Sequence, residues 1–416
     1  MINQDALAFS ASILKCVSAH IFAGVIRGLN RLFSRRVPWF IGLICSSTII
    51  PLSITIAAPL PPVVCIGGAT DCGVVSLPSS EPKKWHPGHY MMLSLGESRD
   101  GALRTRFRLY QRIANNTQIQ GVVLRIKWGQ LEGDEGQYTF DTLQKDLDYL
   151  KNLAVPKRLF VRIHDRAFGK RIECATDDVF PSYLRNQKGC LKTDKGTTSR
   201  IWTPYVQDRL IALYEAMAEK WDDDPYFEGV YLIRETAKNG VIRGDSEFSK
   251  AAHLRGLRRI AEAADAIFVK SNAIMSVNYA EGQANVDELI AFNAALDIGQ
   301  GGPDTLNPAC SRSYPHAYKT ITGDSGGVDY RGFLPVMYST EASQMGGKLG
   351  NCTPDQIRDF ANDVLHASHL FWSRNTYMGS PAQQWIEGIL PYINDPENNL
   401  THTSCTASYE QGCDTN

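Results

Sequence analysis

Short apolar segments alternate with amphipathic segments along most of this chain, and this alternation constrains its fold more than any other feature. Residues 102–115 carry apolar side chains at helical spacing, whereas residues 121–128 form a short, mainly apolar run typical of a buried strand. The expected strands are 89–96, 121–128, 158–165, 229–235, 272–279, 296–304, 333–341 and 368–374. The expected helices are 102–115, 141–153, 204–221, 246–268, 286–295, 354–366 and 381–393, with Asp141 and Thr353 as caps of the second and the sixth.

Strands that alternate with helices predict an α/β fold with a parallel sheet. Eight such strands favour a single (β/α)8 TIM barrel over residues 88–394. An open doubly wound sheet is the alternative, and such folds often carry a glycine-rich phosphate loop that opens a helix. The glycines of residues 299–302 do not open a helix, which favours the barrel.

The N-terminal segment differs in kind from the rest of the chain. Residues 37–70 contain no charged residue, and Arg31, Arg35 and Arg36 precede them. Basic residues, an apolar run and small residues near Ala58 are typical of a signal peptide. Residues 1–58 are therefore expected to be a signal peptide or, through residues 37–58, an uncleaved membrane anchor. The product would be secreted, periplasmic, or anchored outside the cytoplasm.

The cysteines agree with export. Eight cysteines follow residue 58, and an even number in an exported chain predicts disulfides. Sequence alone leaves the connectivity open, and pairing in chain order is the simplest hypothesis. It gives Cys65–Cys72, Cys174–Cys190, Cys310–Cys352 and Cys405–Cys413. The Pro- and Gly-rich residues 59–87 would wrap the barrel, and the last pair would tie down the polar tail 395–416.

Composition excludes some classes of function. The chain has 43 Lys and Arg against 44 Asp and Glu, so no basic excess indicates a nucleic-acid partner. The predicted strand ends lack a His and Asp cluster with metal-ligand spacing, and no cofactor is expected.

Chemistry in barrel enzymes takes place at the C-terminal ends of the strands. Glu235 ends the fourth predicted strand and Glu341 the seventh. Other polar or aromatic residues at strand ends are Lys127, Trp128, His164, Asp165, Arg234, Asn278, Tyr279, Asp304, Ser339, Trp372 and Arg374. Paired carboxylates with aromatic neighbours are typical of an enzyme that cleaves sugars.

These positions resemble those of the large clan of retaining glycoside hydrolases on (β/α)8 barrels, which includes β-galactosidases and cellulases. In that clan the acid/base Glu closes strand four and the nucleophilic Glu closes strand seven, as Glu235 and Glu341 do here. Residues 128–150 also resemble the segment after strand two in several families, and Trp372 stands where the clan places an aromatic under the cleaved sugar. The resemblance covers residues 88–394.

The resemblance implies that Glu341 attacks the anomeric carbon while Glu235 protonates the leaving oxygen. It implies carbohydrate binding by Trp128, His164, Arg234, Asn278, Tyr279 and Trp372. Arg125 or His164 would keep Glu341 ionised.

One departure from the clan concerns Arg234, which stands where the clan has an Asn that binds the 2-hydroxyl group. Asn278 is the expected substitute. If Arg234 and Glu235 belong to one strand, their side chains point to opposite faces and do not pair. A non-catalytic carbohydrate-binding or cell-envelope protein on the same scaffold remains the alternative function.

Overall fold

The computed structural model describes residues 81–416 except 187, 239 and 375–378. All of them belong to one compact unit, Val63–Asn416. The predicted signal peptide or anchor, the Cys65–Cys72 pair and most of the 59–87 extension lie outside the described residues. Within the described part, no helix combines the length and the apolar character needed to cross a bilayer.

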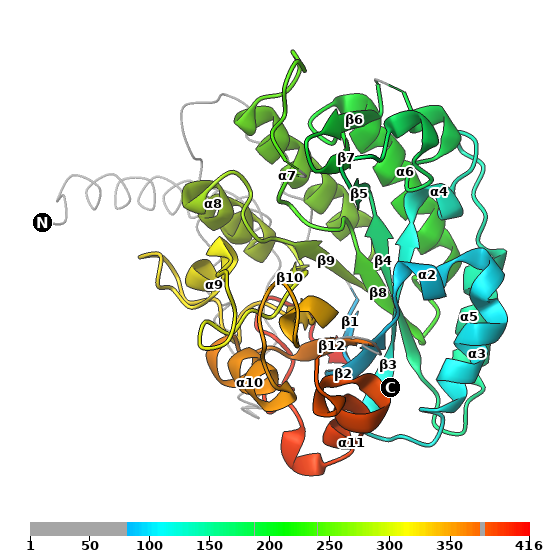
Figure 1. Cartoon of the computed structure of the whole chain (residues 1–416), viewed down its shortest axis with the longest axis vertical. Coiled ribbons are helices and arrows are strands. Elements are labelled where there is room, and N and C mark those ends of the chain that lie inside the picture. Colours follow the sequence, from blue (N-terminus) through cyan, green and yellow to red (C-terminus); the bar gives the residue numbers. More distant parts are fainter. Residues whose placement is uncertain (1–80, 187, 239, 375–378) are drawn as a thin grey trace, which may run out of the picture. The chain divides into compact units, whose positions relative to one another are not determined.

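The described chain forms a closed parallel barrel of eight strands, so the predicted fold class is confirmed (Figure 1). The order around the barrel is β2, β3, β4, β8, β9, β10, β11 and β12, which is also the chain order. The strands are β2 Gly88–Met92, β3 Ile119–Lys127, β4 Arg158–His164, β8 Phe227–Tyr231, β9 Asn272–Ser276, β10 Ile298–Gly302, β11 Val336–Ser339 and β12 His369–Ser373.

Helices surround the strands (Figure 1). They are α2 Leu95–Ser98, α3 Leu103–Gln111, α4 Trp128–Leu131, α5 Asp141–Lys151, α6 Pro204–Trp221, α7 Lys250–Ile267, α8 Gln283–Ala294, α9 His316–Ile321, α10 Pro354–Asp359 and α11 Leu390–Ile393. Thr353 caps α10 as predicted, with its side chain accepting from the amide of Gln356. The prediction for Asp141 is wrong, because Asp141 is the first helical residue and Phe140 occupies the N-cap position.

Strand alternation divides the apolar residues into two layers. Every second residue of a strand faces the barrel axis, and the apolar ones among them form a buried cluster distinct from the one between strands and helices. The cluster contains Trp85, Tyr90, Met92, Val123, Phe160, Tyr231, Ile274, Met337, Phe371 and Tyr409. The remaining buried apolar side chains pack between strands and helices. These side chains fill the barrel axis, so a site with polar side chains that can reach a substrate is expected at an end of the barrel.

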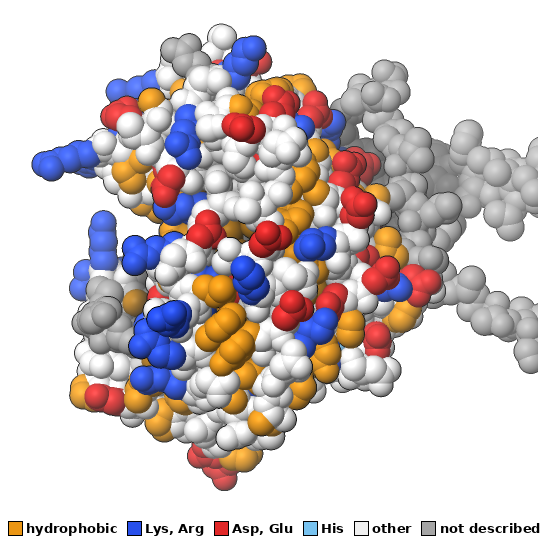
Figure 2. Space-filling model, turned by 90° about the vertical axis from the view of Figure 1, so that its right-hand side faces the viewer, with side chains coloured by type: hydrophobic (Ala, Val, Ile, Leu, Met, Phe, Trp, Pro, Cys, Tyr) orange, Lys and Arg blue, Asp and Glu red, His pale blue; other side chains and the backbone are white. Residues whose placement is uncertain are grey.

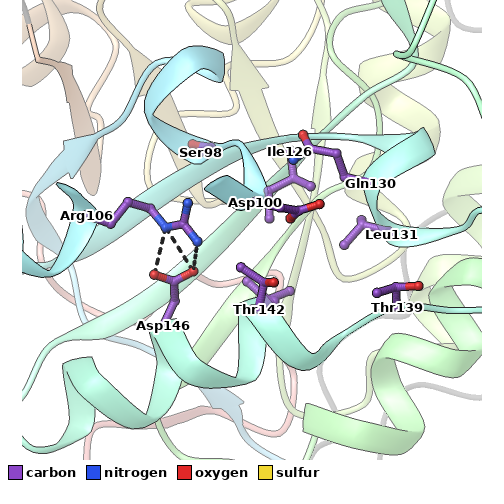
Figure 3. Close-up of a pocket in the computed structure, with 10 residues that line it drawn as sticks. Ser98, Asp100, Arg106, Ile126, Gln130, Leu131, Thr139, Thr142 and Asp146 are labelled. Atoms are coloured by element: carbon purple, nitrogen blue, oxygen red, sulfur yellow. Dashed lines mark hydrogen bonds and ion pairs between the residues drawn. The ribbon is translucent and has the colours of Figure 1, made fainter. Parts of the chain in front are cut away.

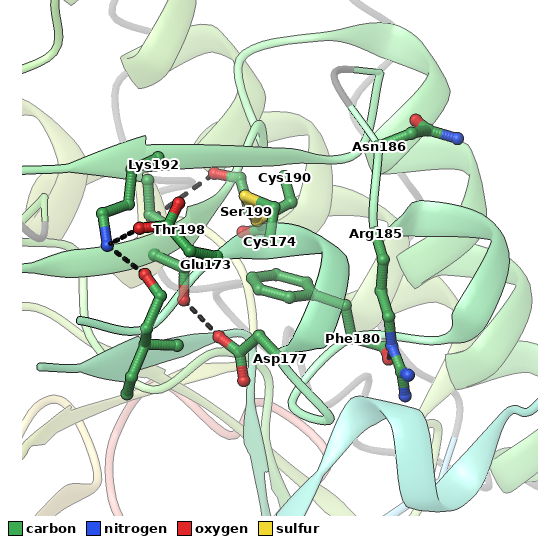
Figure 4. The surroundings of a disulfide bond; sticks show 12 residues. Glu173, Cys174, Asp177, Phe180, Arg185, Asn186, Cys190, Lys192, Thr198 and Ser199 are labelled. Carbon is green, nitrogen blue, oxygen red and sulfur yellow. Dashed lines mark hydrogen bonds and ion pairs between the residues drawn. A yellow bond between two sulfur atoms is a disulfide. The ribbon is translucent and has the colours of Figure 1, made fainter.

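The long connection after β4 contains a small antiparallel sheet that the sequence did not predict. It consists of β5 Arg166–Phe168, β6 Cys190–Thr193 and β7 Gly196–Ser199. The predicted disulfide Cys174–Cys190 joins it to the preceding loop. Figure 4 shows Lys192 beside Glu173 next to this disulfide, and the two side chains form an ion pair of 2.9 Å. The disulfide and the ion pair hold β6 against the loop.

The two other described disulfides also follow chain order. Cys310 is bonded to Cys352 and Cys405 to Cys413. The tail returns to the start of the described chain, where β13 Cys413–Asp414 pairs in parallel with β1 Lys83–Lys84. The Lys84 ammonium donates to the carbonyls of Asp222, Asp224 and Phe227 at 2.7–2.8 Å. These contacts fix both ends of the described chain to the barrel.

The outer surface carries charges of both signs. Figure 2 shows the right-hand side of the molecule as seen in Figure 1, with Lys, Arg, Asp and Glu side chains interspersed among apolar ones. Lys and Arg side chains are most frequent along the left edge of that view, where the surface is notched.

Candidate active site

Glu341 follows the C-terminal end of β11. Its Oε1 accepts a hydrogen bond of 2.8 Å from Nη1 of Arg125 on β3, and the Arg125 Nε donates to the carbonyl of Leu93 at 2.9 Å. Glu341 is the N-cap of the short helix Ala342–Gln344 after the strand, and its backbone amide donates to the side chain of Gln344. The carboxylate is therefore held by a fixed cation, and about a quarter of the side chain is exposed (26%).

Glu235 lies after β8 and contacts the neighbouring strand β9. Its Oε2 accepts from the side-chain nitrogen of Asn278 at 2.6 Å. The Asn278 oxygen accepts from the amides of Ala237 and Tyr279, both at 2.8 Å, and from the Thr236 hydroxyl at 3.2 Å. Three donors on the oxygen side fix the orientation of the amide, so that its nitrogen faces Glu235.

Arg234 and Glu235 form an ion pair, which the sequence analysis did not expect. The distance from Arg234 Nε to Glu235 Oε1 is 3.8 Å. The prediction was wrong because β8 ends at Tyr231 and the chain beyond it bulges. The Leu232 amide donates to the Ile274 carbonyl and the Thr236 amide to the Ser276 carbonyl. The chain therefore advances four residues after β8 while the neighbouring strand β9 advances only two. This bulge removes the alternation that would separate the two side chains.

Two more basic groups lie below the mouth of the barrel on β4. The buried Arg162 donates to the Ser339 hydroxyl at 3.0 Å and to the Arg234 carbonyl at 2.8 Å. His164 is also buried and lies 3.4 Å from Arg234 Nη1. Burial lowers the pKa of His164 well below its usual value, and the neighbouring Arg234, Arg162 and Arg125 act in the same direction. His164 is therefore neutral beside three cations.

Asp304 lies after β10 at the same end of the barrel. Burial raises the pKa of its carboxyl to about 8, and repulsion from Glu341 and Glu235 adds to the effect. Arg162 and Arg234 oppose it only in part. The Asp304 Oδ1 and the His164 Nε2 are buried and have no hydrogen-bond partner among the described residues. Both atoms could interact with a bound ligand.

The structure brings most of the candidate residues from the sequence to this end of the barrel. Tyr279 follows β9, and its ring contacts His316 edge to face with centroids 5.4 Å apart. Lys127 is paired with Asp178 at 2.5 Å, and the buried Glu132 with Arg209 at 2.5 Å, so both charges are engaged in ion pairs.

The expectation that Trp128 and Trp372 offer an aromatic face to a sugar is wrong, because both side chains are fully buried (0% exposed). Trp128 belongs to the outer core and donates to Glu132 at 2.9 Å. On β12, Phe371 faces the barrel axis, so Trp372 points outward to the helices. The Trp372 indole donates to His89 at 3.0 Å.

Two residues of the site were not singled out from the sequence, Arg162 and Phe168. Arg162 stands two positions before His164 in the apolar strand 158–165, and this spacing places both on one face. That signal was available in the sequence. Phe168 is 48% exposed, and its ring lies 4.3 Å from the Arg234 guanidinium. No local pattern could have found this contact, because it depends on the path of the β5–β7 insertion.

A separate small pocket lies outside this site. Ser98, Asp100, Arg106, Gln130, Thr139 and Asp146 are among the residues that line it, and Figure 3 shows Arg106 directed at Asp146. The Arg106 guanidinium donates three hydrogen bonds of 2.7–3.0 Å to that carboxylate. The two charges are therefore paired with each other.

Comparisons with known proteins give structural likeness only. No family model matches the chain, and no curated protein matches it. Among solved structures, endo-glycoceramidase II from Rhodococcus sp. in its ganglioside GM3 complex is 10% identical, with a TM-score of 0.48. That match covers 77% of this chain and 81% of the other. Exo-beta-1,4-mannosidase Op5Man5 from Opitutaceae bacterium strain TAV5 is also 10% identical, with a TM-score of 0.46 over 77% of this chain and 58% of the other.

Both matched proteins are named as glycosidases. Fold alone does not fix function. Function is inferred below from the residues of the site.

Proposed function

We propose that this protein is a retaining β-glycosidase that acts on an oligo- or polysaccharide. In this proposal Glu341 is the nucleophile and Glu235 the general acid and base. The observation that carries the proposal is the different setting of the two carboxylates. Glu341 is ion-paired with Arg125 at 2.8 Å, whereas the shortest contact of Glu235 is with the neutral amide of Asn278 at 2.6 Å.

This difference matches the two roles. A nucleophile must be ionised, and Glu341 accepts a charge-assisted hydrogen bond of 2.8 Å from the fixed Arg125 guanidinium. In the first step Glu341 displaces the leaving group from the anomeric carbon while Glu235 donates a proton to the departing oxygen. In the second step Glu235 takes a proton from water, and that water releases the sugar from Glu341. The Asn278 amide orients Glu235 in both steps.

We further propose that the protein works outside the cytoplasm. The three disulfides of the described residues support this, because disulfides persist in oxidising compartments. Cell fractionation of the full chain tests it. Recovery in the cytoplasm with free thiols would contradict export.

The mechanism is tested with dinitrophenyl β-glycosides and sodium azide. In Glu341→Ala, azide should attack in place of the nucleophile and give the α-glycosyl azide, because only one displacement occurs. In Glu235→Ala, azide should intercept the glycosyl-enzyme and give the β-glycosyl azide after two displacements. The same anomer from both variants, or unchanged hydrolysis, would refute the assignment. Glycan binding by a wild-type protein that hydrolyses nothing would instead support the non-catalytic alternative.

A further inference from the structure

The mouth of the barrel holds more positive than negative charge. Arg125, Arg162 and Arg234 are three cations around Glu235 and Glu341. The raised pKa of Asp304, about 8, leaves that carboxyl mostly protonated at neutral pH, and the lowered pKa of His164 leaves the imidazole uncharged. When Glu235 is protonated as the proposed acid, the Glu341 carboxylate faces three guanidinium groups. Asp165 accepts from the Arg234 amide at 3.2 Å, but it is paired with a further cation, Arg166, at 3.6 Å and does not reverse the excess.

Arg234 is the least engaged of these cations. Arg125 is held by Glu341 and the Leu93 carbonyl, and Arg162 by Ser339 and the Arg234 carbonyl. The contacts of the Arg234 guanidinium with polar side chains are longer, at 3.4 Å to His164 and 3.8 Å to Glu235. An arginine has five N–H donors, so most of its capacity is available to a ligand.

Phe168 holds the Arg234 guanidinium in place at the mouth. The ring and the guanidinium are 4.3 Å apart, within the range of a cation–π contact. Phe168 is 48% exposed and the Arg234 side chain 20% exposed, so both are accessible to solvent. A planar guanidinium on an aromatic platform suits recognition of a carboxylate or sulfate.

We propose that Arg234, supported by Phe168, binds an anionic group on the sugar, so that the substrate is an acidic glycan bearing a carboxylate or a sulfate. This inference rests on the proposed function, which places the cleaved bond between Glu235 and Glu341. The two can be tested separately, because binding of an acidic glycan can be measured without turnover.

The binding test uses Glu341→Gln, which should not turn over substrate, and the same variant with Arg234→Gln added. The probes are β-linked disaccharides of gluco, galacto and manno configuration, each in a neutral, a C6-carboxylate and a C6-sulfate form. We expect the anionic form of at least one configuration to bind about 10- to 100-fold more tightly than its neutral form. Arg234→Gln should abolish this preference. The stronger of the two anionic forms identifies whether a carboxylate or a sulfate is recognised.

Lys127→Gln is the matched control, because it removes one positive charge at the end of β3 where Lys127 pairs with the exposed Asp178. It should change the preference for anionic probes less than about twofold. Equal binding of neutral and anionic forms in all three configurations would overturn the inference, as would an equal loss of preference in Lys127→Gln. Both outcomes leave the assignment of Glu235 and Glu341 untouched.

Turnover gives an independent readout if the glycosidase activity is established. Arg234→Gln should lower kcat/KM for the acidic aryl glycoside about 10- to 100-fold and that for its neutral counterpart much less. Equal losses on both substrates would show a merely structural role.

Discussion

Arg125 on β3 and Glu341 after β11 form an ion pair of 2.8 Å, although 216 positions of sequence separate them. Barrel closure brings them together, because inward-facing residues of distant strands meet at one end of the barrel. The pair joins a cation with limited exposure to a carboxylate at the mouth. It therefore provides a direct test of which carboxylate acts as the nucleophile.

Replacement of Arg125 should affect activity more than stability. We expect Arg125→Gln to lower kcat about 100-fold or more, because the ionised form of Glu341 loses its charge-assisted hydrogen bond. The loss in unfolding free energy should be about 1–3 kcal/mol, the usual range for a broken hydrogen bond to a charged group. Arg125→Lys keeps the charge but cannot donate to both Leu93 and Glu341 in the same geometry, and should be intermediate. Steady-state kinetics and urea unfolding provide the comparison. Full activity in Arg125→Gln would contradict the assignment of Glu341.

Two substitutions of Asn278 distinguish its hydrogen bond to Glu235 from its contribution to the stability of the fold. Asn278→Asp keeps an oxygen for the Ala237 and Tyr279 amides, but replaces the donor to Glu235 with a second negative charge. Glu235 therefore loses its orienting hydrogen bond, so kcat/KM should fall about 10-fold or more while the fold is kept.

Asn278→Ala removes the oxygen as well. It leaves buried donors unsatisfied and should cost about 1–3 kcal/mol of unfolding free energy. Thermal unfolding and steady-state kinetics of both variants test the contrast. An Asp variant less stable than the Ala variant would contradict the hydrogen-bond orientation described here.

Asp304 should make stability depend on pH in a specific direction. Its pKa is raised in the folded state to about 8, so the folded protein binds more protons than the unfolded chain between about pH 4 and pH 8. The contribution of this group is fully present below its unfolded pKa and is lost as pH rises through the folded value. Asp304→Asn should therefore gain roughly 4 kcal/mol relative to wild type between pH 5 and pH 9. Denaturant unfolding at both pH values measures it, and a constant difference would contradict the raised pKa.

The three disulfides should differ in their contribution to stability according to the length of chain they close. The sequence separations are 42, 16 and 8 residues for Cys310–Cys352, Cys174–Cys190 and Cys405–Cys413. Loop-closure entropy predicts losses of about 4, 3 and 2.5 kcal/mol for the corresponding double Cys→Ser variants. Equilibrium unfolding of each variant tests this order. Loss of the Cys174–Cys190 bond should also reduce any dependence of binding on Phe168, because β5 pairs with β7 and β7 with the cross-linked β6.

Much of the fold was predictable because strand and helix periodicities are local. All eight strands of the barrel were expected within a few residues, and α6 was expected at its observed bounds. The expectations about the site that failed depend on the path of the chain after a strand or on the face to which a strand residue points. The bulge after Tyr231 brought Arg234 beside Glu235, and the outward register of β12 buried Trp372.

The sequence by itself determined the alternation of strands and helices, the presence of Glu235 and Glu341 at the ends of two strands, and an even number of cysteines after the N-terminal segment. Each of these depends on residue order and on local preference. Only the tertiary structure decided which cation supports each glutamate, that the tryptophans are core residues, and that Phe168 lies against Arg234. Those contacts join segments far apart in the chain, and they form only when the barrel closes and its loops pack at one end.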